Sequence, residues 1–274
     1  MSIITKPIRL IELFAGVGSQ AQALKNIEAE FEHYRVVEFD KYPVASYNAI
    51  HGTNFTPLDV TQIHAEDLGI VDKDRFQYLL TYSFPCQDLS VAGKGAGMKR
   101  DSGTRSGLLW EVERILKECA EKGELPDILL MENVPQVHGK KNMADFNEWL
   151  DTLESLGYWN IWTDLNATGF GVAQNRNRCF CVSVLGGKEG DYTFPEPTEL
   201  TKCMADYLDE VVDEKYYINN ERAQMLIDKM IASGQLDEYE ASFETHKGVG
   251  CFVTPEGKAA DIEKLLGESE VGHG

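Results

Sequence analysis

The sequence predicts an α/β fold of the doubly wound type, with a mostly parallel sheet between layers of helices. Between residues 8 and 185, short apolar runs alternate with stretches whose apolar residues recur at helical spacing. This alternation is typical of βαβ units, whose strands pair in parallel through right-handed crossovers. Polar motifs follow several of the apolar runs directly. Because ligands bind beyond the carboxyl ends of such strands, these motifs predict one site.

Five runs are expected to form strands, because each is short, apolar and bounded by polar residues or glycine. They lie at residues 8–13, 34–40, 78–83, 127–131 and 179–185. A helix is expected after the first strand, where Leu24, Ile27 and Phe31 recur at helical spacing. Three further helical stripes lie at residues 108–119, 143–153 and 220–231.

Composition limits the class of protein. The 274 residues are 43% hydrophobic and 26% charged, which suits one large domain or a domain with an appendage. A net charge of −19 excludes a protein that coats nucleic acid through overall basic charge, but it allows a basic cleft. Residues 190–274 alone carry a net charge of −12. With two prolines near residue 195, this predicts a main domain over 1–194 and an acidic appendage over 195–274.

Cysteine usage predicts free thiols in a reducing cytosol. The six cysteines are spread along the chain without the spacing of a disulfide framework. Cys179 and Cys181 are two apart, which suits two core residues on one strand face better than a zinc site, and no metal is expected. No apolar run reaches 18 residues, and the amino terminus lacks the pattern of a signal peptide, so no membrane span is expected.

The first motif, Phe-Ala-Gly-Val-Gly at residues 14–18, follows the first strand. Its glycines allow a tight turn and a close approach of the backbone to a ligand. Glu38, about 20 residues on, is placed to bind a ribose hydroxyl pair. The two features fit a dinucleotide enzyme and a methyltransferase equally. A nicotinamide dehydrogenase would favour a third glycine where this chain has Ala21 or Gln22.

Three further motifs carry reactive side chains at strand ends. Cys86 stands behind Pro85 and is either a nucleophile or an inert buried thiol. Glu132 is either a proton carrier or a solvated carboxylate. Arg176 and Arg178 point the same way on extended backbone, where they either bind a carbonyl oxygen or phosphate, or form an ion-paired edge.

Together, these motifs resemble the cytosine-C5 DNA methyltransferases, which use S-adenosylmethionine. The matching segments are Phe-Ala-Gly-Val-Gly, Glu38, Asp59-Val60-Thr61, Phe-Pro-Cys-Gln, Glu-Asn-Val and Gln-x-Arg-x-Arg, in this order over residues 8–185. The resemblance implies the Rossmann-like methyltransferase fold. It also implies a DNA (cytosine-5-)-methyltransferase, acting in a bacterial cell or phage-infected host as part of a restriction-modification or phage system.

The resemblance assigns roles to these residues. Cys86 attacks C6 of the cytosine ring, Glu132 protonates N3, and Arg178, supported by Arg176, binds the O2 carbonyl. The cofactor-binding residues it implies are Phe14 on adenine, Glu38 on the ribose, Asp59 on the adenine amine, Gly16 and Gly18 near the methionine part, and Pro85.

The target base must be flipped out of double-stranded DNA, its expected partner. Glycines and basic residues after Cys86 resemble the loop that closes over the flipped base, where the glycines permit movement and the cations meet phosphates. The DNA-binding residues implied are Ser90, Lys94, Lys99, Arg100 and Arg105.

The chain departs from the family near its end, where a Gly-Asn-Ser-like turn beside the cofactor is expected and absent from the sequence. This predicts half of a split enzyme completed by a second polypeptide, a truncated chain, or a compact variant, with residues 195–274 forming a partial target-recognition region. Two other functions remain open. One is a tRNA cytosine-C5 methyltransferase, and the other is an inactive or partner-dependent subunit.

Overall fold

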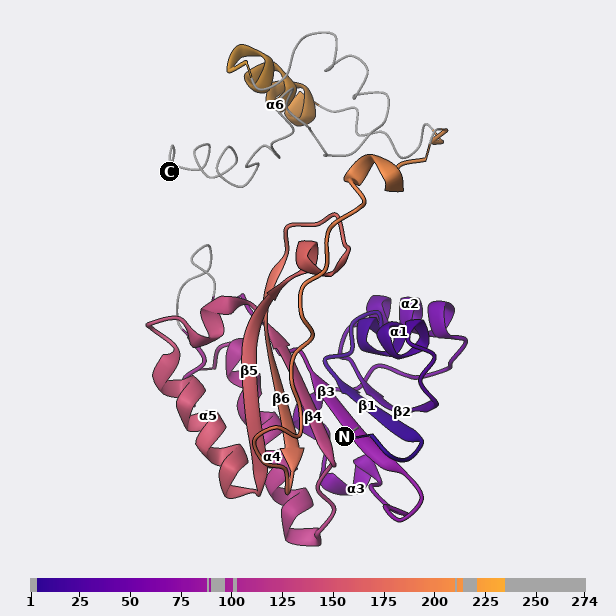
Figure 1. The fold of residues 1–274 in the computed structure, drawn as a ribbon, viewed down its shortest axis with the longest axis vertical. Coiled ribbons are helices and arrows are strands. Elements are labelled where there is room, and N and C mark those ends of the chain that lie inside the picture. Colours follow the sequence, from indigo (N-terminus) through magenta and orange to yellow (C-terminus); the bar gives the residue numbers. More distant parts are fainter. Residues whose placement is uncertain are drawn as a thin grey trace. The chain divides into compact units, whose positions relative to one another are not determined.

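The computed structural model describes residues 4–87, 89, 97–100, 103–209, 211–213 and 221–234 (Figure 1). Residues 8–185 contain a six-stranded sheet. The strand order is β2-β1-β3-β4-β6-β5. The strands are β1 Ile8–Leu13, β2 Phe31–Val37, β3 Gln77–Tyr82, β4 Ile128–Asn133, β5 Tyr158–Asn166 and β6 Asn177–Leu185. The pairs β1–β2, β1–β3 and β3–β4 are parallel, whereas β6 runs antiparallel to both β4 and β5. The doubly wound, mostly parallel fold is therefore confirmed.

Helices from the chain before residue 200 cover both faces of this sheet. The α-helices are α1 Ser19–Asn26, α2 Lys41–His51, α3 Ala65–Leu68, α4 Leu109–Lys122, α5 Met143–Ser155 and α6 Glu221–Ala232. Short 3₁₀ helices are η1 Val60–Gln62, η2 Ser106–Leu108, η3 Pro135–His138, η4 Ala167–Phe170 and η5 Met204–Tyr207. Side chains of α3, α4 and α5 pack in one core cluster, and those of α1 and α2 pack in the other.

The interior strand β1 shows why the sheet has a core cluster on each face. Ile11 and Leu13 belong to the cluster with α4 and α5, while Ile8 and Leu10 belong to the cluster with α1 and α2. All four side chains are at most 2% exposed. A parallel strand buried on both faces reads as a continuous apolar run, which is how this segment appears in the sequence.

Two predicted elements needed correction near the amino terminus. The expected helical stripe continues to Phe31, but α1 ends at Asn26 and Phe31 begins β2. Ile27 is 72% exposed, because it caps the end of α1 instead of facing the core. The strand β2 accordingly begins and ends three residues earlier than expected.

The strand β5 was missed by the sequence reading. It lies at the edge of the sheet, and only Tyr158 of its nine residues is fully buried. An edge strand exposed in this way lacks the apolar run that marks the interior strands. By contrast, the stripes that predicted α4, α5 and α6 are confirmed to within three residues at each end.

The chain divides into two compact units, Met1–Leu200 and Thr201–Gly274. In the second unit, the described part includes α6, whose Ile227 and Met230 are buried. No helix within the described ranges is both long and apolar enough to span a bilayer. The five described cysteines are all free thiols, as expected.

Candidate functional site

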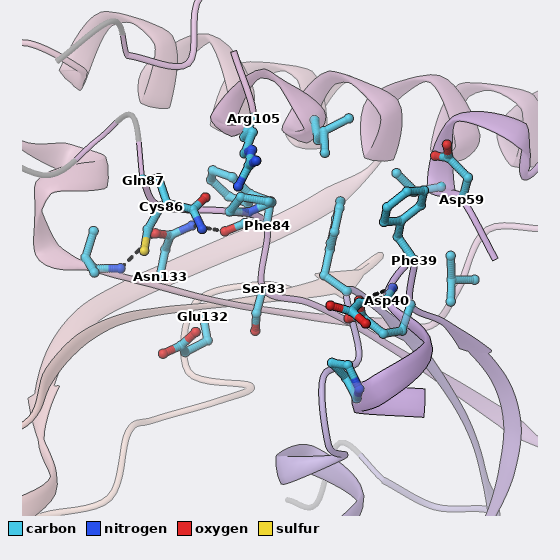
Figure 2. A pocket seen from close by; sticks show the side chains of 18 of the residues that line it. Phe39, Asp40, Asp59, Ser83, Phe84, Cys86, Gln87, Arg105, Glu132 and Asn133 are labelled. Atoms are coloured by element: carbon cyan, nitrogen blue, oxygen red, sulfur yellow. Dashed lines mark hydrogen bonds between the residues drawn. The ribbon is translucent and has the colours of Figure 1, made fainter. Parts of the chain in front are cut away.

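A cavity of about 780 Å³ opens at the carboxyl ends of β1, β2, β3 and β4 (Figure 2). It lies where the alternating pattern predicted a site. Nine of the predicted site residues line it: Phe14, Glu38, Asp59, Pro85, Cys86, Arg105, Glu132, Arg176 and Arg178. The labelled residues form two groups, with Cys86, Glu132 and Arg105 on one side and Phe39 and Asp59 on the other.

The glycine-rich turn after β1 depends on positive backbone angles. Gly18 begins α1 with φ of 82°, and a Cβ there would lie 2.4 Å from His51 Nε2 and 2.6 Å from the Tyr47 ring. Gly16 also has a positive φ, of 55°, but a Cβ there would meet nothing within 4 Å. Gly18 therefore serves internal packing, whereas Gly16 leaves open space beside the backbone. Neither glycine lines the cavity itself.

Glu38 follows β2 and its carboxylate is fixed by two backbone groups. Gly16 N donates to Oε2 and Asp40 N donates to Oε1, each at 3.0 Å. Each carboxylate oxygen has more than one acceptor site, so capacity to accept from a ligand hydroxyl remains. The bond from Gly16 ties the end of β2 to the glycine-rich turn after β1, so these two predicted motifs form one wall of the cavity.

Asp59 is the N-cap of η1. Its Oδ1 accepts from both the backbone N–H and the hydroxyl of Thr61, at 2.9 Å each. This arrangement is a typical cap, in which the side chain satisfies an otherwise unpaired N–H. Its Oδ2 makes no hydrogen bond within the described residues, so this oxygen can accept from a ligand amine.

The loop that carries Cys86 is held at two successive carbonyls. Asn133 Nδ2 donates to Phe84 O at 3.0 Å, and Ser106 Oγ donates to Pro85 O at 2.7 Å. Both donors are buried, at 2% and 0% exposure, whereas Cys86 is half-buried. The thiol is thus presented to the cavity by a fixed backbone. Sequence reasoning missed Ser106, which has no motif around it, and it named Asn133 only as part of Glu-Asn-Val.

Glu132 and the two arginines form an ion-paired group. Arg178 Nε lies 3.1 Å from Glu132 Oε1, and Arg176 Nη2 lies 3.7 Å from the same oxygen. The Glu132 side chain is 21% exposed. Asn166 fixes the arginine segment, because its Oδ1 accepts from Arg176 N at 3.1 Å. The structure therefore brings together three residues that the sequence places 44 and 46 positions apart.

The predicted DNA-binding residues occupy different environments. Arg105 lines the cavity, whereas Lys99 and Arg100 do not. The Arg100 guanidinium pairs with Glu113 and Glu148 and lies 3.8 Å from the centre of the Trp110 ring, which gives it an internal structural role. Ser90 and Lys94 fall outside the described residues. Phosphate binding by any of these five residues stays a prediction.

Phe39 is a site residue that the sequence reading overlooked. Its ring is 75% exposed and lines the cavity directly after Glu38. A large aromatic side chain exposed in a cavity offers a flat apolar face to a ligand ring. The available signal was an aromatic residue between two acidic ones at a strand end.

One group outside the cavity has the donor atoms for a metal ion. Ligand atoms of His138, Asp164 and Cys179 lie within 4.8 Å of one another. These donors already satisfy each other, since His138 Nε2 lies 2.9 Å from Asp164 Oδ1. Burial and the Asp164 carboxylate raise the pKa of the Cys179 thiol, so it keeps its proton. The group is accordingly a hydrogen-bonded contact between η3, β5 and β6.

Comparison with known proteins gives consistent results. A sequence model of the family described as C-5 cytosine-specific DNA methylase matches residues 8–258. Type II methyltransferase M2.ScrFI of Lactococcus lactis subsp. cremoris is 36% identical over 260 residues, covering 78% of this chain and 71% of that protein. Orphan methyltransferase M.SssI of Spiroplasma monobiae is 35% identical over 268 residues, covering 79% and 68%.

Solved structures show the same fold. The Dnmt2 methyltransferase of S. pombe has a TM-score of 0.62 at 22% identity, covering 85% of this chain and 67% of that one. The methyltransferase EhMeth of Entamoeba histolytica has a TM-score of 0.65 at 18% identity, with coverage of 85% and 68%. At these identities the likeness concerns the fold.

Proposed function

The chain belongs to the C-5 cytosine-specific DNA methylase family, and we propose that it methylates cytosine in duplex DNA through a covalent bond to Cys86. One observation carries this proposal. A single cavity holds one group made of a nucleophile, a carboxyl group and two cations, and a second group made of two oriented carboxylates and an exposed aromatic ring. The first group suits a cytosine ring and the second suits an adenosine.

The cofactor half fits S-adenosylmethionine. The carboxylate of Glu38 would accept from the ribose hydroxyls, the free Oδ2 of Asp59 from the adenine amine, and Phe39 would stack on the adenine ring, with Phe14 also lining this part of the cavity. The open space beside Gly16 leaves room for the methionine portion. The cavity volume lies within the usual range for small-molecule sites. When bound, this cofactor supplies the methyl group that C5 of cytosine takes up.

In the catalytic half, Cys86 and Glu132 act on the cytosine ring together. The Cys86 thiolate adds to C6 while Glu132 delivers a proton to N3, so that electron density builds up at C5. After C5 has taken up the methyl group and lost its proton to a base, the C6–S bond breaks, the thiolate is restored, and N3 returns its proton to Glu132. The fixed carbonyls of Phe84 and Pro85 hold the thiol in place throughout.

The arginines orient both the carboxyl group of Glu132 and the cytosine base. Arg178 Nε holds Glu132 Oε1 at 3.1 Å, and a guanidinium has five donors, so Arg178 can also donate to the O2 carbonyl of cytosine. Arg176 supports the same carboxylate from 3.7 Å. When a flipped cytosine enters this group, hydrogen bonds to its N3 and O2 replace part of the ion pair between Glu132 and the arginines. This exchange favours cytosine over water in the site.

The experiment that tests the proposal measures transfer of a labelled methyl group from S-adenosylmethionine to mixed-sequence duplex DNA, with a tRNA pool in parallel. We expect transfer to DNA in the wild type and its loss, by at least about 10³-fold, in Cys86→Ala, which removes the nucleophile. Cys203→Ala removes an exposed free thiol and is the matched control.

Duplex DNA containing 5-fluorocytosine adds a second readout. Fluorine at C5 cannot leave as a proton, so the wild type should remain covalently attached to this DNA and Cys86→Ala should not. Transfer to tRNA but not DNA would replace the proposed substrate. Transfer that survives Cys86→Ala would overturn the proposed nucleophile.

A further inference from the structure

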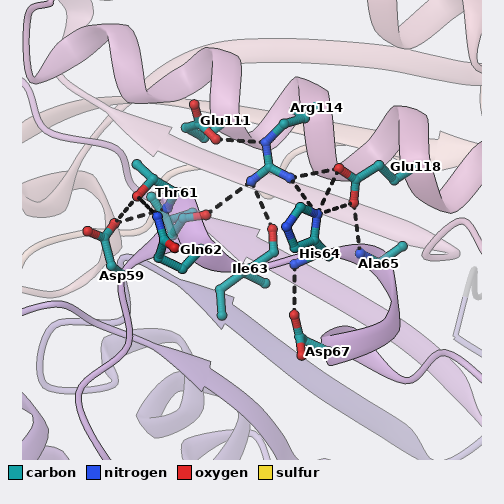
Figure 3. A network of polar contacts seen from close by, with 11 residues as sticks. Asp59, Thr61, Gln62, Ile63, His64, Ala65, Asp67, Glu111, Arg114 and Glu118 are labelled. Carbon is teal, nitrogen blue, oxygen red and sulfur yellow. Dashed lines mark hydrogen bonds and ion pairs between the residues drawn. The ribbon is translucent and has the colours of Figure 1, made fainter.

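Arg114 on α4 reaches across to the segment that carries Asp59 (Figure 3). Its Nη2 donates to Ile63 O at 2.8 Å and to Val60 O at 3.3 Å. Both carbonyls belong to the η1 turn or its C-cap. These two carbonyls lie 51 and 54 residues before Arg114 in the sequence. The contact therefore fixes two distant parts of the chain against each other.

Acidic residues hold the guanidinium from both ends. Arg114 Nε donates to Glu111 Oε2 and Nη1 donates to Glu118 Oε1, each at 2.8 Å. Glu118 Oε2 in turn accepts from Ala65 N, at the start of α3, at 3.1 Å. The side chains of Arg114 and Glu118 therefore bind two carbonyls and one amide of the segment from Val60 to Ala65. Because the fork of the guanidinium is planar and fully engaged, it has little freedom to move.

The segment held in this way forms part of the cavity wall. Asp59, Val60 and Thr61 all line the cavity, and Asp59 is the N-cap of the same η1 turn. Arg114 itself does not line the cavity. It can therefore influence the cofactor only through the backbone that it holds.

We propose that Arg114 is a positioning residue for S-adenosylmethionine, which fixes the η1 turn so that Asp59 Oδ2 faces the adenine amine. This inference rests on the proposed function, in which Asp59 accepts from that amine. Without Arg114 the turn would shift relative to α4, and the Asp59 carboxylate would move out of hydrogen-bonding range. A group that only stabilised the fold would instead affect all activities of the protein alike.

The first experiment compares Arg114→Met with Arg35→Met in the full chain. Arg35 is the matched control, because it also donates to two backbone carbonyls, those of Asp67 and Tyr34, and does not line the cavity. We expect Arg114→Met to raise the dissociation constant of S-adenosylhomocysteine, measured by titration calorimetry, by about tenfold, the value of one hydrogen bond. The KM for S-adenosylmethionine should rise with little change in kcat. Arg114→Lys should restore part of the affinity, and Arg35→Met should leave it unchanged.

A double-mutant cycle with Asp59→Ala decides whether Arg114 acts through Asp59. If it does, Arg114→Met should weaken binding by less than about twofold in the Asp59→Ala background, since the contact it positions is already gone. A tenfold loss in both backgrounds would overturn the proposal. An equal loss of affinity in Arg35→Met would overturn it as well, by showing a general effect on the fold.

The failure of the proposed function gives a different pattern. In that case the wild type itself would not bind S-adenosylhomocysteine, and Asp59→Ala would have no effect on binding that could be compared with the effect of Arg114→Met. Binding in the wild type that is insensitive to Asp59→Ala but sensitive to Arg114→Met would retain the cofactor site and overturn the positioning role.

Discussion

The two halves of the cavity are held by different kinds of interaction. In the cofactor half, Glu38 and Asp59 are fixed by hydrogen bonds to backbone N–H groups, from Gly16, Asp40 and Thr61. In the catalytic half, Glu132 is held by the cationic side chains of Arg176 and Arg178. Because backbone donors are part of the fold itself, we expect the first arrangement to change little when a ligand binds. In the second arrangement, a bound cytosine base can replace part of the ion pair with its own contacts to Glu132 and the arginines.

This difference predicts a separate role for each half of the cavity. A carboxylate held by backbone groups can accept from a ligand without rearranging, so it contributes to binding. In the proposed mechanism, a carboxylate paired with arginines in a partly buried site exchanges partners as charge develops on the base, and we expect it to contribute to the chemical step. We therefore expect substitutions in the two halves to affect different kinetic parameters.

The largest effect is expected from Glu132→Gln. The amide keeps the shape of the side chain but cannot deliver a proton to N3, so kcat should fall by about 10²- to 10⁴-fold. The dissociation constant for S-adenosylhomocysteine should stay within about threefold of the wild type, because Glu132 lies in the other half.

Glu38→Gln is the matched substitution in the cofactor half. It should raise the dissociation constant by about tenfold while kcat at saturating cofactor changes little. If Glu132→Gln weakened cofactor binding as much as Glu38→Gln, the division between the halves would be wrong.

The next largest effect concerns the support beneath the cofactor half. Glu12 on β1 is fully buried and accepts from Tyr47 Oη at 2.5 Å, and the Tyr47 ring packs on Gly18. Burial raises the pKa of Glu12 to about 7, although the bond from Tyr47 opposes this shift. His33 Nδ1 lies 2.7 Å from the same hydroxyl, and burial, with the charges of His51 and Lys25, lowers the pKa of His33 to about 4.

These two shifts have opposite consequences for stability. Glu12 keeps its proton in the folded state, so its contribution is complete below pH 4.5 and is lost as the pH rises through 7. The contribution of neutral His33 is present above pH 6.5 and is lost as the pH falls through 4. Between these limits the two slopes largely cancel in the wild type.

Glu12→Gln should remove the contribution of Glu12 and leave the change of unfolding free energy with pH that comes from His33. Relative to the wild type, the free energy of unfolding of E12Q should rise by about 3 kcal/mol between pH 4.5 and 8, measured by urea denaturation. Any constant cost of the buried amide does not affect this slope.

Glu113→Gln is the control with the opposite sign. Burial of Glu113 opposes ionisation, but bonds from Arg100 and Lys117 outweigh it and lower the pKa of Glu113. E113Q should therefore lose stability at neutral pH and approach the wild type in acid. A flat difference between E12Q and the wild type would show that Glu12 does not titrate in this range.

The sequence predicts the residues that line the cavity better than it predicts the residues that support them. Glu38 directly follows β2, Cys86 comes four residues after the end of β3, and Glu132 is the second-last residue of β4. Parallel topology places the carboxyl ends of such strands at one edge of the sheet. Ser106 and Arg114 carry no such signal. The backbone carbonyls that they hold lie 21 to 54 residues away, and any residue supplies a carbonyl, so the sequence does not identify these contacts.

Edges and boundaries were also beyond the sequence pattern. The end of α1 is a case in point, because Ile27 continues the helical spacing while the chain turns at Glu28, with φ of 54°. The strand β5 is recognised only through its nine-residue pairing with β6. Tertiary pairing, and not local preference, decided both features.

An effect on affinity as small as that of Glu38→Gln, and the sharpest test of the cofactor half, concerns Phe39. Its ring is 75% exposed, so its removal should cost little stability. If it stacks on adenine, Phe39→Ala should raise the dissociation constant of S-adenosylhomocysteine about tenfold, in line with one to two kcal/mol per stacked base. Tyr42→Ala is the control, since Tyr42 is 71% exposed in the first turn of α2 and does not line the cavity. Equal affinity in both variants would mean that the carboxylates bind the adenosine without help from this ring, and the aromatic part of the cofactor half would have to be assigned to Phe14 instead.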